Sequence, residues 1–239
     1  MFSKTKISGV ALATLVAVAF IACGGGSSST DGLKACNDGD KKACDAIATS
    51  LKTDCDKGKG EACTKLGAIY FGMASDKDMI SMFGGDYSKV AKPDELQAIT
   101  LLDKACGLNN GLGCIYIGAA YAGKGDSDKS ESLFKKGLDI LEKECDSGNK
   151  TSCAIAGSVS YEKREYQKAS QLFAKVCDKL DKTTDTLTHE ACIHLGDMYM
   201  NSLGVTQDME QAKKYYKKVC DGGEQSGCTK FRTANEKSK

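Results

Sequence analysis

Two motifs of apolar and polar positions recur along the chain, and both have the spacing of a helix. The first places an apolar residue three positions after a cysteine, a glycine at the fourth and a tyrosine at the seventh, as in Cys63-x-x-Leu66-Gly67-x-x-Tyr70. Positions 0, 3, 4 and 7 share one helical face, so the motif predicts a helix whose glycine lies where a neighbouring helix packs closely. The full copies begin at Cys63, Cys114 and Cys192, and a partial copy begins at Cys153.

The second motif ends on a cysteine and predicts the other helix of each pair. It is represented by Leu172-Phe173-x-Lys175-Val176-Cys177, and the other copies end at Cys106, Cys220 and, in a divergent form, Cys145. A glycine or asparagine often follows three residues later, a residue type that tolerates the left-handed conformation ending a helix. These positions are Gly39, Gly58, Asn109, Gly148 and Gly223. We therefore expect this cysteine in the last turn of one helix and the next cysteine at the start of the following helix.

Twelve of the 13 cysteines fall into pairs on this pattern. Five pairs are separated by eight positions and one by fifteen: Cys36/Cys44, Cys55/Cys63, Cys106/Cys114, Cys145/Cys153, Cys177/Cys192 and Cys220/Cys228. Such cysteine content is unusual in a reducing cytosol and typical of an oxidising compartment.

The first residues predict export. Lys4 and Lys6 precede an apolar run from Ile7 to Ala22 that is short for a membrane span, so we assign residues 1–22 as a signal peptide.

The end of this segment resembles the lipobox of bacterial lipoproteins. Phe20-Ile21-Ala22-Cys23 has the small residue before the cysteine, although Phe20 stands where Leu is usual. The resemblance implies that Cys23 carries lipid, and the alternative is an ordinary signal peptide with a chance cysteine. Residues 23–33 are predicted to be the lipidated N-terminus and a flexible Gly/Ser linker. We expect a lipid-anchored protein of the bacterial cell envelope that faces the periplasm or the exterior, with the outer membrane favoured; a secreted protein is the alternative.

The repeated unit resembles a known family. The stretch from Cys192 to Ala212, Cys-x-x-Leu-Gly-x-x-Tyr-x-x-Ser-x-Gly-Val-x-x-Asp-x-x-Gln-Ala, is similar to the Sel1-like repeat, a relative of the tetratricopeptide repeat. Ser202 stands where Gly is usual and Gln211 where Lys is usual. The cysteine-rich form resembles the Helicobacter-type cysteine-rich proteins. The resemblance covers Cys36 to Cys228 and implies an all-α fold, a right-handed α/α superhelical solenoid with one disulfide per repeat junction.

In this framework the predicted solenoid occupies residues 34–239. It consists of a short N-terminal unit, four repeats and a capping helix, at residues 34–60, about 61–108, 109–147, 148–187, 188–223 and 224–237. The first repeat contains a long insertion at residues 73–93, which either folds back over its own repeat or binds a partner.

Spacing and resemblance together predict the disulfides Cys36–Cys44, Cys55–Cys63, Cys106–Cys114, Cys145–Cys153, Cys177–Cys192 and Cys220–Cys228. Each short loop that a disulfide closes constrains the unfolded chain by about 2–3 kcal/mol. The alternatives are free buried cysteines or zinc ligands, but zinc sites favour cysteines two to four positions apart.

The composition and motifs of the sequence offer few candidate catalytic or metal-binding residues. Lys+Arg is 33 and Asp+Glu is 32, a balance that argues against nucleic-acid binding. His189 and His194 are five positions apart, about 140° around a helix, so they do not form a metal pair. We expect neither a metal nor a cofactor. Ser132-x-x-Lys135 lacks the partner motifs of a serine β-lactamase. Weak β-lactamase or penicillin-binding activity is therefore only an alternative that the resemblance implies.

The preferred function is a binding scaffold. Carrying the concave positions of tetratricopeptide repeats onto this sequence yields a mixed apolar and polar face without a clamp of basic residues. The candidates are Thr64, Phe71, Ile115, Tyr161, Glu162, Ile193, Asp197, Met200 and Asn201. We expect this face to bind a protein or peptide of the cell envelope, with the chain acting as a monomer. Alternatively, Ile115 and Ile193 belong to the core between repeats.

Overall fold

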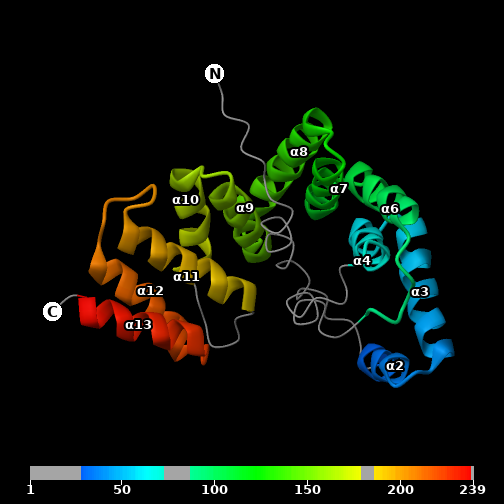
Figure 1. Cartoon of the computed structure of the whole chain (residues 1–239), viewed down its shortest axis with the longest axis horizontal. Coiled ribbons are helices and arrows are strands. Elements are labelled where there is room, and N and C mark those ends of the chain that lie inside the picture. Colours follow the sequence, from blue (N-terminus) through cyan, green and yellow to red (C-terminus); the bar gives the residue numbers. More distant parts are fainter. Residues whose placement is uncertain (1–27, 73–86, 179–185, 238–239) are drawn as a thin grey trace. The chain divides into compact units, whose positions relative to one another are not determined.

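The computed structural model describes residues 28–72, 87–178 and 186–237, and these segments are helical throughout apart from short turns and connections (Figure 1). Of the described residues, 79% lie in helices and none lies in a strand. The predicted all-α fold with a disulfide at each junction is confirmed. The predicted signal peptide, Cys23 and residues 73–86 of the insertion lie outside the described residues.

The helices form two compact units, Met1–Ile140 and Leu141–Lys239. Unit 1 contains α2 (Ser28–Asn37), α3 (Lys41–Asp56), α4 (Gly60–Tyr70), α6 (Glu95–Gly107), α7 (Gly111–Gly123) and most of α8 (Ser127–Asp146). Unit 2 contains the end of α8, α9 (Lys150–Glu162), α10 (Tyr166–Cys177), α11 (Thr186–Asn201), α12 (Met209–Asp221) and α13 (Gln225–Lys237). Within each unit, consecutive helices other than α8 pack against one another, and α8 approaches α7 closely at Gly118. We call α4, α7, α9, α11 and α13 the A helices, and α6, α8, α10 and α12 the B helices.

Polar caps begin several of these helices. Asp94 accepts a 3.0 Å hydrogen bond from the backbone N–H of Gln97 at the start of α6, and Asn110 accepts a 2.8 Å bond from Gly113 at the start of α7. Such caps satisfy N–H groups that have no partner inside the helix.

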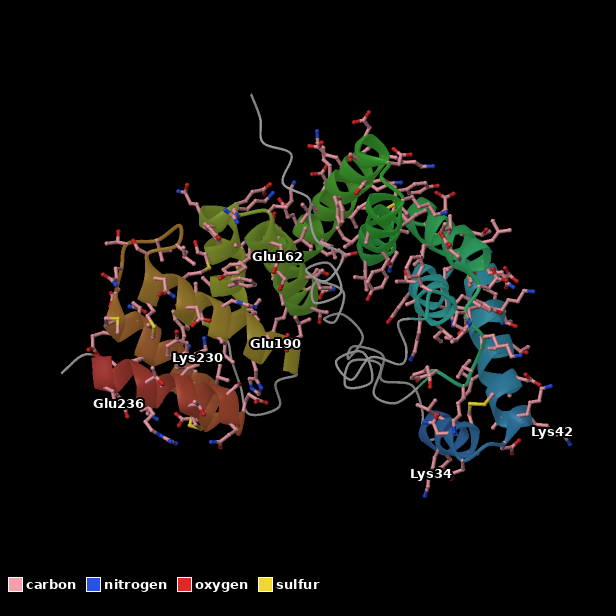
Figure 2. The ribbon with its side chains drawn as sticks, viewed as in Figure 1. Lys34, Lys42, Glu162, Glu190, Lys230 and Glu236 are labelled. Atoms are coloured by element: carbon pink, nitrogen blue, oxygen red, sulfur yellow. A yellow bond between two sulfur atoms is a disulfide. The ribbon has the colours of Figure 1, made fainter. Side chains whose placement is uncertain are left out.

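A disulfide joins the two helices at each junction, and Figure 2 shows the sulfur bonds in yellow. The Cα atoms of the five pairs separated by eight positions are 4.5 to 4.7 Å apart, and those of Cys177 and Cys192 are 5.4 Å apart. The structure contains the six predicted pairs: Cys36–Cys44, Cys55–Cys63, Cys106–Cys114, Cys145–Cys153, Cys177–Cys192 and Cys220–Cys228.

Left-handed backbone conformations end the helices at these junctions, as the sequence pattern predicted. The φ angles are +103° at Gly39, +85° at Gly58, +96° at Gly148 and +94° at Gly223, and Asn109 has a φ of +57°. The turn from α9 to α10 places Arg164 in the same conformation, with a φ of +61°.

The glycine of the first motif lies where the prediction placed it, under the B helix of the same repeat. A Cβ atom on Gly67 would lie 2.8 Å from Leu102 Cγ, and one on Gly157 would lie 2.6 Å from Phe173 Cδ1. Real Cβ contacts are essentially never that short. Glycine is therefore needed here for close helix packing, which compensates for its poor helix propensity.

The lysine of the second motif connects α6 to α3 and α10 to α8. Lys104 Nζ lies 2.7 Å from Asp56 Oδ1, and Lys175 Nζ lies 2.6 Å from Asp146 Oδ1. Each aspartate directly follows the first cysteine of the preceding junction. The hydrogen bond and charge of Lys104 hold the pKa of Asp56 below its usual range.

Two helices begin earlier than the predicted boundaries. α2 begins at Ser28, inside the predicted linker at 23–33, and buries Leu33 as well as Cys36. α11 begins at Thr186 and buries Leu187 and His189. In both cases apolar side chains upstream of the cysteine extend the buried face.

The described end of the insertion folds back onto unit 1. Tyr87 and Val90 are buried, and Lys89 donates a 2.6 Å hydrogen bond to the carbonyl of Asn37. In the described part of the chain, no helix is both long and apolar enough to cross a bilayer.

Candidate functional site

Two of the predicted binding residues in unit 1 lie in its core. Thr64 is buried and its hydroxyl donates a 2.9 Å hydrogen bond to Asn110 Oδ1, whereas Ile115 is only 1% exposed. The assignment of Thr64 and Ile115 to a binding face is therefore wrong, and Ile115 belongs to the core, as the alternative stated. Both side chains directly follow the second cysteine of a pair, where the disulfide holds the preceding helix close. Phe71, at the end of α4, is 38% exposed.

In unit 2 the predicted residues lie on three neighbouring A helices. Helix α11 packs against both α9 and α13, which places Tyr161 and Glu162 of α9 on one flank of α11 and Lys230 of α13 on the other. Figure 2 labels Glu162 and Lys230 on these flanking helices. We call the row formed by Tyr161, Glu162, His194, Asp197, Asn201 and Lys230 the A-helix face.

Aromatic rings form one end of the A-helix face. The Tyr161 ring lies 4.9 Å from that of His194 and 5.3 Å from that of Tyr166, and His194 stacks on Phe173 at 5.9 Å. His194 Nδ1 is buried without a hydrogen-bond partner. Burial lowers the pKa of His194, because a charged imidazolium would lose its hydration. The uncharged ring is thus the form that fits this packing.

An ion pair forms the other end. Lys230 Nζ lies 2.7 Å from both carboxylate oxygens of Asp197, and the Tyr216 hydroxyl donates a 2.6 Å hydrogen bond to Asp197 Oδ1. Burial, followed by this bond to the carboxylate, raises the pKa of Tyr216, so the hydroxyl remains a donor. The Lys230 side chain is 42% exposed and that of Asp197 is 20% exposed. The pair anchors α13 and still faces solvent on its lysine side.

The remaining predicted residues have different roles. Ile193 and Met200 are only partly buried, but both pack against the cluster of Ala212, Tyr216 and Ala234. They therefore hold α12 and α13 on α11. Asn201 is exposed, and its side-chain amide donates a 2.8 Å bond to the Asp197 carbonyl.

Sequence reasoning missed His194 and Lys230 as members of this face. Each stands two positions after the second cysteine of its pair, Cys192 and Cys228, so both have the same register on successive A helices. This shared position after the second cysteine is the sequence signal that could have identified both residues.

The side chains of the A-helix face already bind one another. Asp197 is already engaged by Lys230 and Tyr216, so it is poorly suited to take a proton from a substrate. Ser132 and Lys135 are both exposed on α8. Among the described residues, no group of three or more His, Cys, Asp or Glu side chains could hold a metal ion.

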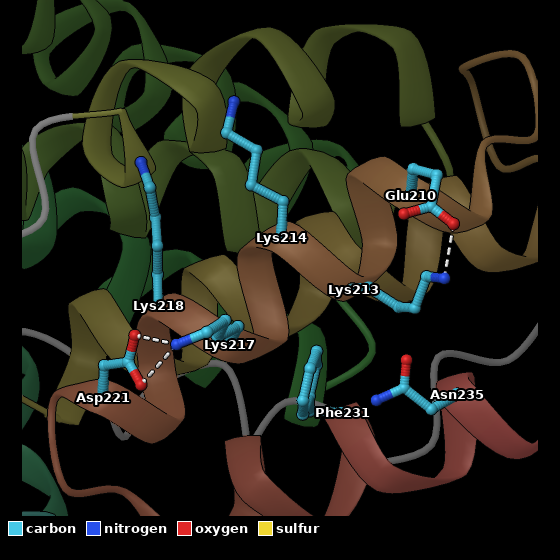
Figure 3. Close-up of a pocket in the computed structure, with 8 residues that line it drawn as sticks. All are labelled: Glu210, Lys213, Lys214, Lys217, Lys218, Asp221, Phe231 and Asn235. Atoms are coloured by element: carbon cyan, nitrogen blue, oxygen red, sulfur yellow. Dashed lines mark hydrogen bonds and ion pairs between the residues drawn. The ribbon is translucent and has the colours of Figure 1, made fainter.

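A separate groove lies between α12 and α13 and has a volume of about 460 Å³ (Figure 3). One wall is a charged stripe on α12 and the other is formed by Phe231 and Asn235 of α13. The stripe consists of Glu210, Lys213, Lys214, Lys217, Lys218 and Asp221. These residues have i, i+3, i+4, i+7, i+8 and i+11 spacing, which places them on one helical face.

A comparison with protein families agrees with the repeat pattern. The Sel1 repeat family matches residues 60–110 and 189–224. A comparison with curated proteins gives no match. Among solved structures, the chain is similar to a Sel1 repeat protein from Oxalobacter formigenes, with 18% identity and a TM-score of 0.45 over 93% of this chain and 61% of that protein.

It is also similar to c5321, a protective antigen of uropathogenic Escherichia coli that displays an SLR fold, with 16% identity and a TM-score of 0.35. That similarity covers 85% of this chain and 50% of the antigen. The chain thus spans about three fifths and one half of these two proteins. The two matched segments bear out the resemblance to Sel1 repeats in one helix pair of each unit.

Proposed function

We propose that this chain is an exported lipoprotein that acts as a protein- or peptide-binding scaffold, with the A-helix face of unit 2 as a contact surface. The observation that carries the proposal is the row of partly exposed aromatic, polar and charged side chains that three A helices present together. Sel1 repeats generally mediate protein–protein interaction, which supports the same function.

The chemistry of the face favours a neutral or mixed partner segment. Tyr161 offers an aromatic surface with a polar hydroxyl, a combination common in protein interfaces. Glu162 and Asn201 are exposed and add polar contacts at its edge. The described face contains no nucleophile–base pair, so its side chains are suited to binding.

The binding role can be tested by capture of partners from cell envelopes with the full disulfide-bonded chain. Glu162→Arg combined with Asn201→Arg changes two exposed A-face residues and should remove the captured proteins. Glu131→Arg with Gln167→Arg makes the same charge change on the exposed surfaces of B helices α8 and α10 and should leave capture unchanged. Equal capture by both variants would exclude the A-helix face as the contact surface.

The lipoprotein part of the proposal is tested separately. Cys23→Ala removes the thiol that would carry lipid and should move the protein from the membrane fraction to the soluble fraction. A variant that stays with membranes as the parent protein does would exclude anchoring through Cys23.

A further inference from the structure

We propose that the Cys220–Cys228 disulfide is the bond through which this chain exchanges with an external dithiol, and that its reduction loosens the start of α13. The inference goes beyond the scaffold function and does not depend on it. It starts from a difference among the disulfides: the ten cysteines of the other five bonds are buried, and none is more than 6% exposed. Of the paired cysteines in the described part of the chain, Cys220 and Cys228 alone are partly exposed.

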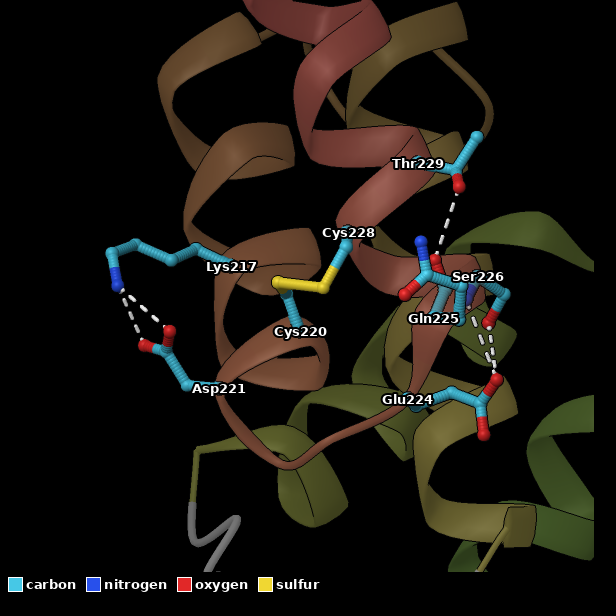
Figure 4. Close-up of a disulfide and its surroundings, with 8 residues drawn as sticks. All are labelled: Lys217, Cys220, Asp221, Glu224, Gln225, Ser226, Cys228 and Thr229. Carbon is cyan, nitrogen blue, oxygen red and sulfur yellow. Dashed lines mark hydrogen bonds and ion pairs between the residues drawn. A yellow bond between two sulfur atoms is a disulfide. The ribbon is translucent and has the colours of Figure 1, made fainter.

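The side chains around this bond also lie at the surface. Figure 4 shows Lys217 and Asp221 on one side of the sulfur atoms and Gln225, Ser226 and Thr229 on the other. All five residues are exposed. Lys217 and Asp221 extend away from the bond and pair with each other, with Nζ 2.6 Å from Oδ2. The bond is therefore bordered by solvent-exposed polar groups and not by the apolar core.

The position of the cysteines in their helices does not distinguish this junction from the others. At each of the five junctions with eight-residue spacing, the first cysteine is the next-to-last residue of one helix and the second is the fourth residue of the following helix. Any effect of the helix ends on a thiolate is therefore shared by these five bonds. Access to the sulfur atoms is what differs.

The reaction is thiol–disulfide exchange, which requires a thiolate to reach a sulfur atom of the bond. A thiolate of the dithiol attacks one sulfur and forms a mixed disulfide, and the other cysteine leaves as a thiolate that takes a proton from water. The second thiol of the reductant, once deprotonated, attacks the mixed disulfide and releases the remaining cysteine. Two electrons pass to the chain, and the reductant becomes a disulfide. A buried bond can react in this way only after the protein opens locally.

Reduction removes a covalent link from the first turn of α13. At this turn the backbone packs closely on α12, because a Cβ atom on Gly227 would lie 2.6 Å from Val219 Cγ1. The other contacts of α13 come later in the helix, where Lys230 pairs with Asp197 and Phe231 packs against the apolar cluster. Loss of the bond should therefore loosen the start of α13 and leave its later turns in place.

The test reduces the full disulfide-bonded chain in its folded state with increasing amounts of dithiothreitol, an uncharged dithiol. Thiols that are free beforehand are blocked first, and those that reduction creates are alkylated and located by mass spectrometry. We expect Cys220 and Cys228 to be alkylated together, and about tenfold or more faster than any other pair. Hydrogen exchange of the same samples should increase at the start of α13 and stay unchanged in α11.

The Cys36–Cys44 disulfide is the matched internal control. It joins α2, the first described helix, in the same way as Cys220–Cys228 joins α13, the last described helix, but it is buried. Fraying of a terminal helix would expose both bonds, whereas static access favours one. Cys220→Ser with Cys228→Ser should abolish the early alkylation, and Cys36→Ser with Cys44→Ser should retain it.

A second series distinguishes a small thiol from a protein as the reductant. It replaces dithiothreitol with a reduced oxidoreductase that has a Cys-x-x-Cys site, and each rate is divided by the rate at which the same reductant reduces glutathione disulfide. A higher ratio for the oxidoreductase would identify a protein dithiol, and a higher ratio for dithiothreitol would identify a small thiol. Either result supports the inference when the reduction is confined to Cys220–Cys228.

Earlier reduction of any other pair, or equal rates for Cys220–Cys228 and Cys36–Cys44, would overturn the inference. Simultaneous loss of all the disulfides would overturn it as well, because the bonds would then be reduced through global unfolding. Selective reduction that leaves hydrogen exchange in α13 unchanged would contradict the loosening of this helix.

Discussion

The ring of Tyr216 lies over Gly196 so closely that a Cβ atom on this glycine would come within 2.5 Å of Tyr216 Cε1. The same tyrosine is fully buried and hydrogen-bonds Asp197 through its hydroxyl. One side chain thus couples the close packing of α11 and α12 to the ion pair that holds α13.

Gly196→Ala should therefore destabilise the protein, because neither the ring nor the helix can move without losing packing or the Asp197 bond. We expect a loss of about 1–3 kcal/mol in the free energy of unfolding, as for other overpacked cores. Gly123→Ala is the matched control, since a Cβ there has no atom within 4 Å and should change stability by less than about 1 kcal/mol. Urea unfolding followed by circular dichroism would measure both variants, and equal midpoints would refute the packing argument.

Arg164→Gly should stabilise the turn between α9 and α10. Arg164 has a φ of +61°, and the corresponding turn between α7 and α8 uses Gly125 with a φ of +81°. Left-handed backbone is unfavourable for a residue with a Cβ by about 1–2 kcal/mol, and the extra flexibility of unfolded glycine offsets about 0.5–1 kcal/mol of that gain.

The net gain should raise the melting temperature of the Arg164→Gly variant. Lys163→Gly, at the neighbouring position with a φ of −72°, should lower it instead. A melting temperature that moves in the same direction for both variants would contradict the conformational explanation.

Acidification should destabilise the protein through His194. Its pKa in the folded state lies below the usual 6.5, chiefly because burial disfavours the charge; Asp197 raises the pKa and Lys230 lowers it. Because the pKa of His194 is lower in the folded state than in the unfolded state, its contribution to the free energy of unfolding is fully present above about pH 6.5. That contribution is lost as the pH falls through the folded-state pKa.

The measurement is the free energy of unfolding from about pH 7.5 to about pH 5, in the parent chain and in His194→Phe. His189 is present in both proteins, so the difference between their curves reports His194. We expect the variant to lose less stability over this range, and parallel curves would show that His194 does not contribute.

Removal of one disulfide should loosen a single helix junction. Figure 4 shows Cys220 and Cys228 joining the end of α12 to the start of α13. Cys220→Ala with Cys228→Ala should lower the free energy of unfolding by about 2–3 kcal/mol. Hydrogen exchange should increase chiefly in α13. The same change at Cys36 and Cys44 should instead affect α2, and uniform exchange changes in both variants would exclude local action.

Much of the fold could be predicted because its junctions repeat in the sequence. Eight-residue cysteine spacing, a glycine or asparagine three positions after the first cysteine, and the glycine of Cys-x-x-Leu-Gly each correspond to one local feature of the structure. Local geometry of this kind is determined by residues close together in the sequence, so it can be predicted from one sequence without an alignment.

The candidate sites were harder to predict because they depend on which helices meet. Ile115 was placed on the binding face by register alone, but the backbone around Gly137 approaches closely enough to bury it. The Lys104–Asp56 pair joins residues 48 positions apart, and the lysine motif alone did not indicate its partner. The α12–α13 groove likewise needs Phe231 and Asn235 from the following helix.

The position of the disulfides has a consequence for how such a chain can grow. From α6 onward each bond joins the B helix of one repeat to the A helix of the next, so one complete repeat contains the second cysteine of one pair and the first cysteine of another. Duplication of a whole repeat within a gene would therefore add one complete pair and leave no orphan thiol. The array could therefore gain or lose whole repeats during evolution while every cysteine remains paired in a disulfide.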